Sequence, residues 1–387
     1  MDPRPDYFAP IQALLEFDDL SKLSKRLIDL TLDTDDVAQY QQTVALLDWL
    51  DSVDAADPNL KPRLAERLAQ LTAYLLAQPE PAPSQTLISA EALTHQYGTQ
   101  QRPFRLGPIS FSLNAGQVVG LVGENGNGKT TLLRVLCGEL QLSSGRLTHH
   151  TPHKSPYELR SKLIYIAQRT PTWKGSLIDN LSYTASLYGC TGTKNTLFVA
   201  LVVARMGLRP YRQHRWADLS SGYKMRFELA RALLSQPRLL FIDEPLANLD
   251  ILAQQTVLDD FKDMTHSPFR PMALMLSSQQ LYEVERTADF VLFLKQGQMD
   301  HSTQHADPTA PQPFIVELDS PWSQDQLQQA LSPLGLAHIQ KNGGTYVCQF
   351  PDSTDAYAFL QLVVQARIPV TSYRDISHST RRFFLNA

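Results

Sequence analysis

Residues 123–130 read GENGNGKT, and this short stretch strongly constrains the fold of the chain. It matches the pattern G-x-x-x-x-G-K-[ST], in which glycines let the backbone curl so that consecutive N–H groups face an anion. The apolar run QVVGLVG before it predicts a buried strand, and TTLLRVLCGEL after it predicts a helix, whose positive N-terminal end also favours an anion. The sequence therefore predicts a phosphate-binding loop between a strand and a helix.

The side chains that close this loop suit a nucleoside triphosphate with a magnesium ion. Lys129 would reach the β- and γ-phosphates, and the Thr130 hydroxyl would ligate Mg²⁺. We expect ATP and Mg²⁺ to bind here. The nucleotide contacts predicted from the loop and the start of the helix are Gly123, Asn125, Gly126, Gly128, Lys129, Thr130 and Thr131.

An acidic motif, RLLFIDEP, lies further along the chain. Its apolar run predicts a buried strand that delivers Asp243 and Glu244 to the strand end. We expect Asp243 to hold Mg²⁺, directly or through water, and Glu244 to act as the general base on the attacking water. This pair indicates that the chain can break the nucleotide as well as bind it.

Strand-like and helical patterns alternate over residues 85–306. KLIYIA, RLLFID, MALMLS and FVLFLK all read as short buried strands. Such alternation predicts a mostly parallel sheet that helices cover on both faces. The predicted fold class is therefore α/β, that of a P-loop NTPase.

Residues 1–84 are predicted to form an acidic helical accessory domain followed by a linker. Apolar residues recur every three or four positions in stretches that begin at Leu20, Val37 and Leu64, and PEPAPS from Pro79 cannot continue a helix. This segment carries 15 acidic residues against 7 basic ones, a net charge of −8. The acidic charge argues against nucleic-acid binding. We interpret residues 1–78 as a surface for a protein partner; the alternative is that they only clamp the ATPase domain.

Residues 307–387 are predicted to form a linker, DPTAPQP, and a small C-terminal domain. The expected order is strand, helix, strand, strand, helix, strand, with a hairpin turn at Asn342-Gly343. This order is typical of a ferredoxin-like α+β domain.

The stretch LSSGYKMRFELARALLSQP resembles the signature of the ABC ATPases, whose usual form is LSGGQ. The positions that match the family are Leu219, Ser220, Gly222 and Arg226. Ser221 and Tyr223 stand where the family usually has Gly and Gln. With the phosphate loop, the acidic pair and Asp250 in LANLD, the motif order over residues 85–306 is similar to that of an ABC nucleotide-binding domain. The resemblance implies that this P-loop NTPase contains a helical subdomain.

The resemblance implies further roles. Tyr97 in HQYG would stack on adenine, and Gln168 in YIAQRT would contact Mg²⁺ and water. Ser220 and Gly222 would face the γ-phosphate bound by another subunit, while Asp250 would communicate across the dimer. The chain would therefore need a second ATPase subunit, identical or different, to complete a site.

One position departs from the family pattern with a consequence for the rate. Where the family has a histidine that contacts the γ-phosphate, this chain has Gln279. Glutamine donates a hydrogen bond but carries no charge, so we expect Gln279 to take part in catalysis and hydrolysis to have a low basal rate.

The resemblance implies a subunit that powers a transporter. No apolar run is long enough for a membrane span, so we expect a separate transmembrane permease subunit. The three widely spaced cysteines favour a reducing cytoplasm, with the chain peripheral on the inner face of the cell membrane. LSSGYKMR and the ending HSTRRFFLNA are similar to type-2 exporter ATPases. The alternative is a soluble ABC ATPase, or a regulatory module that occludes ATP with little hydrolysis.

Overall fold

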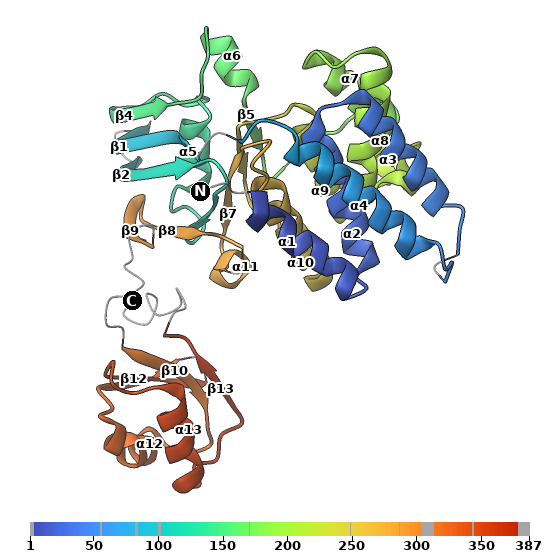
Figure 1. The fold of residues 1–387 in the computed structure, drawn as a ribbon. Coiled ribbons are helices and arrows are strands. Elements are labelled where there is room, and N and C mark those ends of the chain that lie inside the picture. The colour runs from blue at the N-terminus through green and yellow to red at the C-terminus, as the bar shows by residue number, and fades with distance from the viewer. Residues whose placement is uncertain are drawn as a thin grey trace. The chain divides into compact units, whose positions relative to one another are not determined.

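The chain divides into two compact units, Met1–Asp300 and His301–Ala387. The computed structural model describes residues 4–54, 56–81, 84–99, 102–169, 171–247, 249–285, 287–303, 313–342 and 344–377. Figure 1 shows the fold of these residues. None of the described helices combines the length and apolar character that a membrane span requires.

The larger unit begins with the helices α1 (Arg4–Glu16), α2 (Leu20–Thr34), α3 (Val37–Leu50) and α4 (Leu60–Leu76). The last three contain the apolar repeats from which helices were predicted. Asp19 and Asp36 accept backbone N–H groups at the starts of α2 and α3, which satisfies donors that a helix leaves unpaired. Leu23 of α2, Leu71 of α4 and Tyr7 of α1 share one apolar core, so the helices form a packed layer.

The main sheet has the strand order β5-β6-β7-β3-β8-β9. Its strands are β3 (Val118–Val122), β5 (Leu163–Ile166), β6 (Leu239–Ile242), β7 (Ala273–Ser278), β8 (Phe290–Lys295) and β9 (Gln298–Ser302). The pairs from β5 through β8 are parallel. Every residue of β3, β6 and β7 is buried, so both faces of the sheet are covered, and the predicted parallel sheet is confirmed.

A second, antiparallel sheet was not predicted. It has the order β2-β1-β4 and consists of β1 (Thr86–Thr99), β2 (Arg102–Asn114) and β4 (Ser144–His149). Its apolar face shares a core with helix α5 (Lys129–Leu136), which follows the glycine loop; Leu93 and Ile109 of the sheet and Leu132 of α5 are fully buried there. This sheet therefore packs against the helix that follows the loop.

A mostly helical region lies between β5 and β6. It contains α7 (Leu177–Leu187), α8 (Gly192–Arg205), the short η1 (Arg209–Tyr211) and η2 (Trp216–Asp218), and α9 (Ser221–Leu234). Helix α6 (Pro156–Ser161) precedes β5, while α10 (Ile251–Thr265) and α11 (Leu281–Glu285) follow β6 and β7.

The N-terminal helices pack against residues 86–300, which are predicted to be an ATPase and are called the ATPase part below, through a buried ion cluster. Arg205 of α8 has no exposed surface, and it donates to Asp29 of α2 at 2.8 Å and to Asp260 of α10 at 2.5 Å. Arg26 of α2 also donates to Asp29 at 3.0 Å. Burial alone would lower the pKa of Arg205, but the two carboxylates raise it above its usual value. Part of the acidic charge of residues 1–84 is therefore neutralised at this junction.

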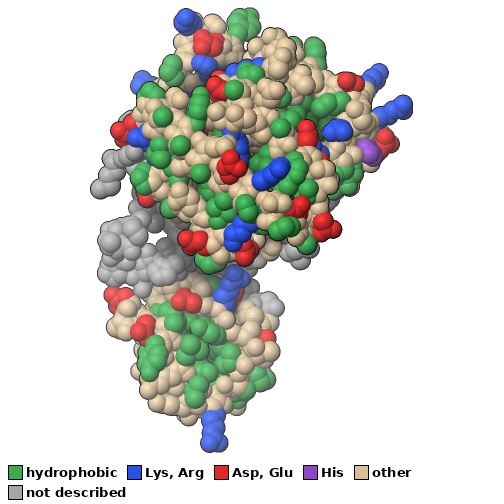
Figure 2. Space-filling model, turned by 45° about the vertical axis from the view of Figure 1, so that its right-hand side comes forward, with side chains coloured by type: hydrophobic (Ala, Val, Ile, Leu, Met, Phe, Trp, Pro, Cys, Tyr) green, Lys and Arg blue, Asp and Glu red, His purple; other side chains and the backbone are tan. Residues whose placement is uncertain are grey.

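The surface of the larger unit carries both charge signs. Figure 2 shows acidic and basic side chains interspersed over its visible face, among apolar ones. At the rim of the junction, Arg209 pairs with the exposed Asp48 and Asp51 of the N-terminal segment at 2.6 and 2.8 Å. The N-terminal helices and the ATPase part thus lie in one compact unit, and the predicted domain boundary at residue 84 stays a prediction.

The smaller unit has the predicted order of elements. Its described elements are β10 (Phe314–Asp319), α12 (Gln324–Leu331), η3 (Ser332–Leu334), β11 (His338–Asn342), β12 (Thr345–Phe350), α13 (Ala356–Gln365) and β13 (Ser372–Asp375). The sheet is antiparallel in the order β11-β12-β10-β13. Most of the linker from Asp307, Gly343 of the predicted turn and the ending 378–387 lie outside the described residues.

Candidate nucleotide-binding site

The glycine loop follows β3 and leads into α5, as the sequence predicts. A Cβ atom at Gly123 would lie 2.4 Å from the Leu294 carbonyl oxygen, so only glycine fits. Gly128 has φ of 97°, and a Cβ there would lie 2.9 Å from the Phe104 ring. Gly126 also has a positive φ, 85°. The glycines therefore allow the backbone to curl through the loop, and no side chain at these positions obstructs the N–H groups.

Lys129 is held inside this loop. Its side chain is 4 % exposed, and its ammonium donates to the carbonyl oxygens of Gly123 at 2.6 Å and Glu124 at 3.2 Å. Burial lowers the pKa of Lys129, while the carboxylates of Glu244 and Asp243 act in the opposite direction. A buried cation that faces only carbonyls and carboxylates is well placed to receive phosphate oxygens.

Asp243 lies at the carboxyl end of β6, where it accepts three side-chain hydrogen bonds. Thr130 donates to one carboxylate oxygen at 2.6 Å, and Tyr165 donates to the same oxygen at 3.3 Å. Ser277, in β7, donates to the other oxygen at 2.6 Å. Burial, together with the Asp243 charge, raises the pKa of the Tyr165 phenol. The structure therefore brings together the predicted Thr130 and Asp243.

Sequence reasoning missed Tyr165 and Ser277 as members of this group. Both are polar residues near the carboxyl ends of β5 and β7, and β6, which carries Asp243, lies between these strands. That shared position is the signal by which they could have been found.

Glu244 is surrounded by donors. Gln168 donates to its carboxylate at 2.6 Å, and the amide of Gln279 donates to both oxygens at 2.8 and 3.0 Å. The Lys129 ammonium lies 3.7 Å away. Glu244 also has φ of 48°, an unfavourable backbone conformation for a residue with a side chain, and Ser277 accepts its N–H at 2.9 Å. These contacts hold the carboxylate beside the loop.

Tyr97 is on β1, opposite Phe104 of β2. Its side chain is 51 % exposed, and its ring centroid lies 5.1 Å from that of Phe104, the ring that also contacts Gly128. The ring is thus next to the loop with surface left for a flat ligand.

The remaining predicted contacts divide into two groups. Asn125 is exposed in the loop and Thr131 is buried in the first turn of α5. Ser220 and Asp250 cap α9 and α10, where each accepts a backbone N–H three residues on, and Gly222 lies in the first turn of α9. The structure of one chain joins Lys129, Thr130, Gln168, Asp243, Glu244 and Gln279 in one network. The nucleotide and metal roles of all these residues stay predictions.

The side-chain oxygens near the loop suit a metal ion that takes only a few of its ligands from the protein. The described residues contain no group of three or more His, Cys, Asp or Glu that could hold an ion unaided. The Thr130 hydroxyl and the Asp243 carboxylate, 2.6 Å apart, instead suit Mg²⁺, which usually keeps one or two protein ligands together with phosphates and water.

Two comparisons of the sequence agree with this site. A family model described as "ABC transporter" matches residues 106–247. The cytochrome c biogenesis ATP-binding export protein CcmA of Xylella fastidiosa is 37 % identical over 178 residues, which cover 46 % of this chain and 79 % of CcmA. The uncharacterized ABC transporter ATP-binding protein YxlF of Bacillus subtilis is 26 % identical over 303 residues, which cover 77 % of this chain and 98 % of YxlF.

Solved structures share the fold of the ATPase part. The cbiO1 protein of Clostridium perfringens, part of the ABC transporter complex cbiONQ, matches 56 % of this chain and 88 % of its own, with a TM-score of 0.50 and 23 % identity. A dimeric post-hydrolysis ATP-binding cassette with ADP and phosphate matches 56 % of this chain and 97 % of its own, with a TM-score of 0.50 and 17 % identity. From its site, its relatives and its fold, this chain belongs to the ABC transporter family and is an ATP-binding subunit.

Proposed function

We propose that this chain hydrolyses ATP to power a membrane transporter, that the transmembrane permease is a separate chain, and that the transport is export. The observation that carries the proposal is the position of Glu244. Its carboxylate follows Asp243 at the end of β6 and lies 3.7 Å from the ammonium of Lys129. A carboxylate at this distance from the phosphate-binding lysine supports hydrolysis rather than binding alone.

The transport role draws on the named relatives. CcmA is named an export protein, and YxlF, 98 % of which the match covers, is named an uncharacterized ABC transporter ATP-binding protein. Because that relative is named for ATP binding alone, we assign the membrane-spanning part to a different polypeptide. The chain would then lie in the cytoplasm, peripheral on the inner face of the cell membrane through its permease.

ATP would enter the loop with its phosphates on the backbone N–H groups and on Lys129. The Lys129 ammonium would exchange the carbonyls of Gly123 and Glu124 for β- and γ-phosphate oxygens, which are stronger acceptors for a buried cation. The exposed ring of Tyr97 would stack on the adenine.

Mg²⁺ would be held by the Thr130 hydroxyl, the Asp243 carboxylate and the Gln168 amide oxygen, which are donors of the kind this ion prefers. When bound, it would offset the negative charge that builds up on the transferred phosphoryl group. Ser277 and Tyr165 would keep the Asp243 carboxylate oriented through the hydrogen bonds they donate to it.

Glu244 would then act on the attacking water. The water oxygen forms a bond to the γ-phosphorus and its proton passes to the Glu244 carboxylate, while the bond from the γ-phosphorus to the bridging oxygen breaks. The products are ADP and inorganic phosphate. Gln168 and Gln279, which both donate to Glu244, would keep the carboxylate facing the site.

Hydrolysis would have a low basal rate because of Gln279. Its amide is committed to Glu244 at 2.8 and 3.0 Å, so it must leave that carboxylate in order to reach a phosphate. A neutral amide also stabilises developing negative charge less than a protonated histidine would. This observation also favours the second candidate function, a regulatory module that occludes ATP with little hydrolysis.

A second ATPase subunit, identical or different, would complete each site. Ser220 lies at the start of α9, where the positive end of the helix would face the γ-phosphate of the other subunit together with Gly222. Asp250 would communicate across that contact.

The flanking segments have their own proposed roles. Residues 1–78 would bind a protein partner, in addition to the structural role that the ion cluster around Arg205 gives them. The β10–β13 unit would be a ferredoxin-like domain, which its sheet order of β11-β12-β10-β13 supports.

The test is isolation of the full chain from solubilised membranes of its native cells through an affinity tag, with the Lys129→Ala variant in parallel. We expect a membrane-spanning chain at a constant ratio to this one, and ATP turnover only in the wild-type complex. Recovery of an active ATPase from the soluble fraction, without a membrane chain, would contradict the transporter proposal. A membrane complex that binds ATP but shows no turnover would favour the occluding module.

A further inference from the structure

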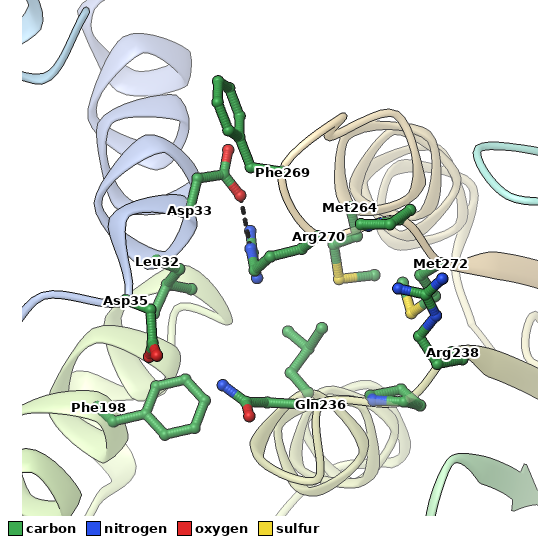
Figure 3. Close-up of a pocket in the computed structure, with 13 residues that line it drawn as sticks. Leu32, Asp33, Asp35, Phe198, Gln236, Arg238, Met264, Phe269, Arg270 and Met272 are labelled. Atoms are coloured by element: carbon green, nitrogen blue, oxygen red, sulfur yellow. Dashed lines mark hydrogen bonds and ion pairs between the residues drawn. The ribbon is translucent and has the colours of Figure 1, made fainter. Parts of the chain in front are cut away.

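A pocket of about 280 Å³ lies where the N-terminal helices meet the ATPase part (Figure 3). Its walls come from the end of α2, from α8, from the turn between α9 and β6, and from the segment between α10 and β7. Leu32 of α2 and Phe198 of α8 form one side, and Met264 and Met272 form the opposite side. We call it the junction pocket. None of the residues of the proposed nucleotide site lines it.

The middle of the junction pocket is apolar. Met264, Met272 and Leu32 are buried, and Leu233 and Pro237 complete the lining between the two sides. Methionine side chains are flexible and polarizable, so they adapt to an apolar guest of irregular shape. The pocket can therefore hold the hydrocarbon body of a small molecule.

The charged groups of the junction pocket are paired, except one. Arg270 donates to Asp33 at 2.6 Å, and Asp35 pairs with Lys194 at 2.7 Å. Among the described residues, Arg238 makes no ion pair, and its Nε is buried without a hydrogen-bond partner. Arg238 is thus the uncompensated cation of the pocket.

Keeping the Arg238 guanidinium charged without an ion-pair partner costs free energy. Burial lowers the pKa of its guanidinium, with no carboxylate nearby to oppose the shift. A guanidinium offers parallel N–H donors that match the two oxygens of a carboxylate. Figure 3 shows this group on the same side of the pocket as Met264 and Met272, so a head bound to Arg238 would place its body toward the methionines.

We propose that the junction pocket binds a small amphipathic monoanion, a carboxylate on an apolar chain, with the carboxylate on Arg238. A dianionic phosphate head fits less well, because Arg238 offers a single positive charge and Arg270, the other cation of the lining, is already paired with Asp33. The proposal is independent of the proposed transport function, because it uses no residue of the nucleotide site.

Because the junction pocket lies between α2 and the sheet, ligand binding there can be measured through the stability of the larger unit. Its ligand would contact α2 together with residues that immediately precede β6 and β7, namely Arg238 and Met272. A molecule that binds the folded arrangement and not the unfolded chain raises the stability of that arrangement. Saturation should therefore raise the unfolding temperature of the larger unit.

The experiment is calorimetric titration of the full chain with octanoate, with octanol as the uncharged analogue and octyl phosphate as the dianionic one. We expect saturable octanoate binding with a Kd of about 1 mM or tighter, at least tenfold weaker binding of both analogues, and unchanged ATP affinity. Equal binding of octanol and octanoate, or no saturable octanoate binding, would overturn the proposal. Tighter binding of octyl phosphate would overturn the choice of a monoanion.

Two variants locate the site. Arg238→Gln should weaken octanoate binding at least tenfold, while Arg212→Gln, which changes an exposed arginine outside the pocket, should leave it unchanged. The unfolding temperature with and without octanoate checks that each variant is folded. Wild-type affinity in Arg238→Gln would overturn the assignment, and the comparison of octanoate with octanol in the wild-type chain tests it without any variant.

Discussion

Replacing Arg205 by methionine should destabilise the larger unit strongly. The change keeps a flexible apolar stem but removes the cation between Asp29 and Asp260, both of which are buried with it. Removing one partner of a buried ion pair leaves an uncompensated charge and typically costs about 3–5 kcal/mol. We expect the loss in unfolding free energy to fall in that range.

Arg209→Met is the matched control at the same junction. Arg209 also pairs with two aspartates of the N-terminal segment, but the side chains of Asp48 and Asp51 are 65 % and 62 % exposed. Exposed ion pairs contribute about 0–1 kcal/mol because water and salt screen them. The two variants therefore differ in burial rather than in the kind of pair removed.

The assay is urea unfolding of the full chain, followed by tryptophan fluorescence, with the transition of the larger unit fitted for each variant. Adding Asp29→Asn to Arg205→Met should recover part of the loss, because it removes one carboxylate from a cluster that has lost a cation and in which Asp29 keeps only Arg26 as a close partner. If Arg205→Met and Arg209→Met cost the same within about 0.5 kcal/mol, the buried cluster does not fasten the N-terminal helices to the ATPase part.

Two further predictions concern single side chains. Gln279→His, measured with the membrane partner present, should raise steady-state ATP turnover several-fold, because a histidine can carry positive charge at this position; no change or a fall would mean that Gln279 does not limit the rate. Burial raises the pKa of Cys137 to about 11 and that of Cys348 to about 12, and it also raises the pKa of Cys190. Because Cys190 is only half-buried while the other two are buried, iodoacetamide should label Cys190 first in the native chain. Mass spectrometry follows the labelling of each cysteine. Labelling of Cys348 as fast as Cys190 would contradict the packing of the smaller unit.

The parts of the site that sequence could predict are those fixed by local chain geometry. Gly123, Gly128 and Lys129 are close in sequence, and a strand that ends in Asp243-Glu244 delivers both carboxylates to the edge where the loop lies. The carboxyl ends of parallel strands lie along one edge of the sheet. The sequence therefore predicts that these distant motifs meet at that edge.

Other features depend on contacts between distant segments, which no local sequence pattern predicts. The β1–β2 ladder changes register between Ala90 and Leu93 and again before His95, which breaks the alternation by which strands are recognised. The partners of Arg205 come from segments 176 and 55 residues away. The junction between the N-terminal helices and the ATPase part therefore could not be predicted from helical periodicity.

The measurement that tests the central claim most directly is ATP binding and single-turnover hydrolysis by the Glu244→Gln variant of the isolated complex. The change keeps the size of the side chain and removes the proton acceptor. We expect ATP affinity within a few-fold of wild type and a hydrolysis rate reduced by about 10²–10⁴-fold, the usual contribution of a general base. Hydrolysis at the wild-type rate would show that Glu244, beside Lys129 at the end of β6, is not the base of this site.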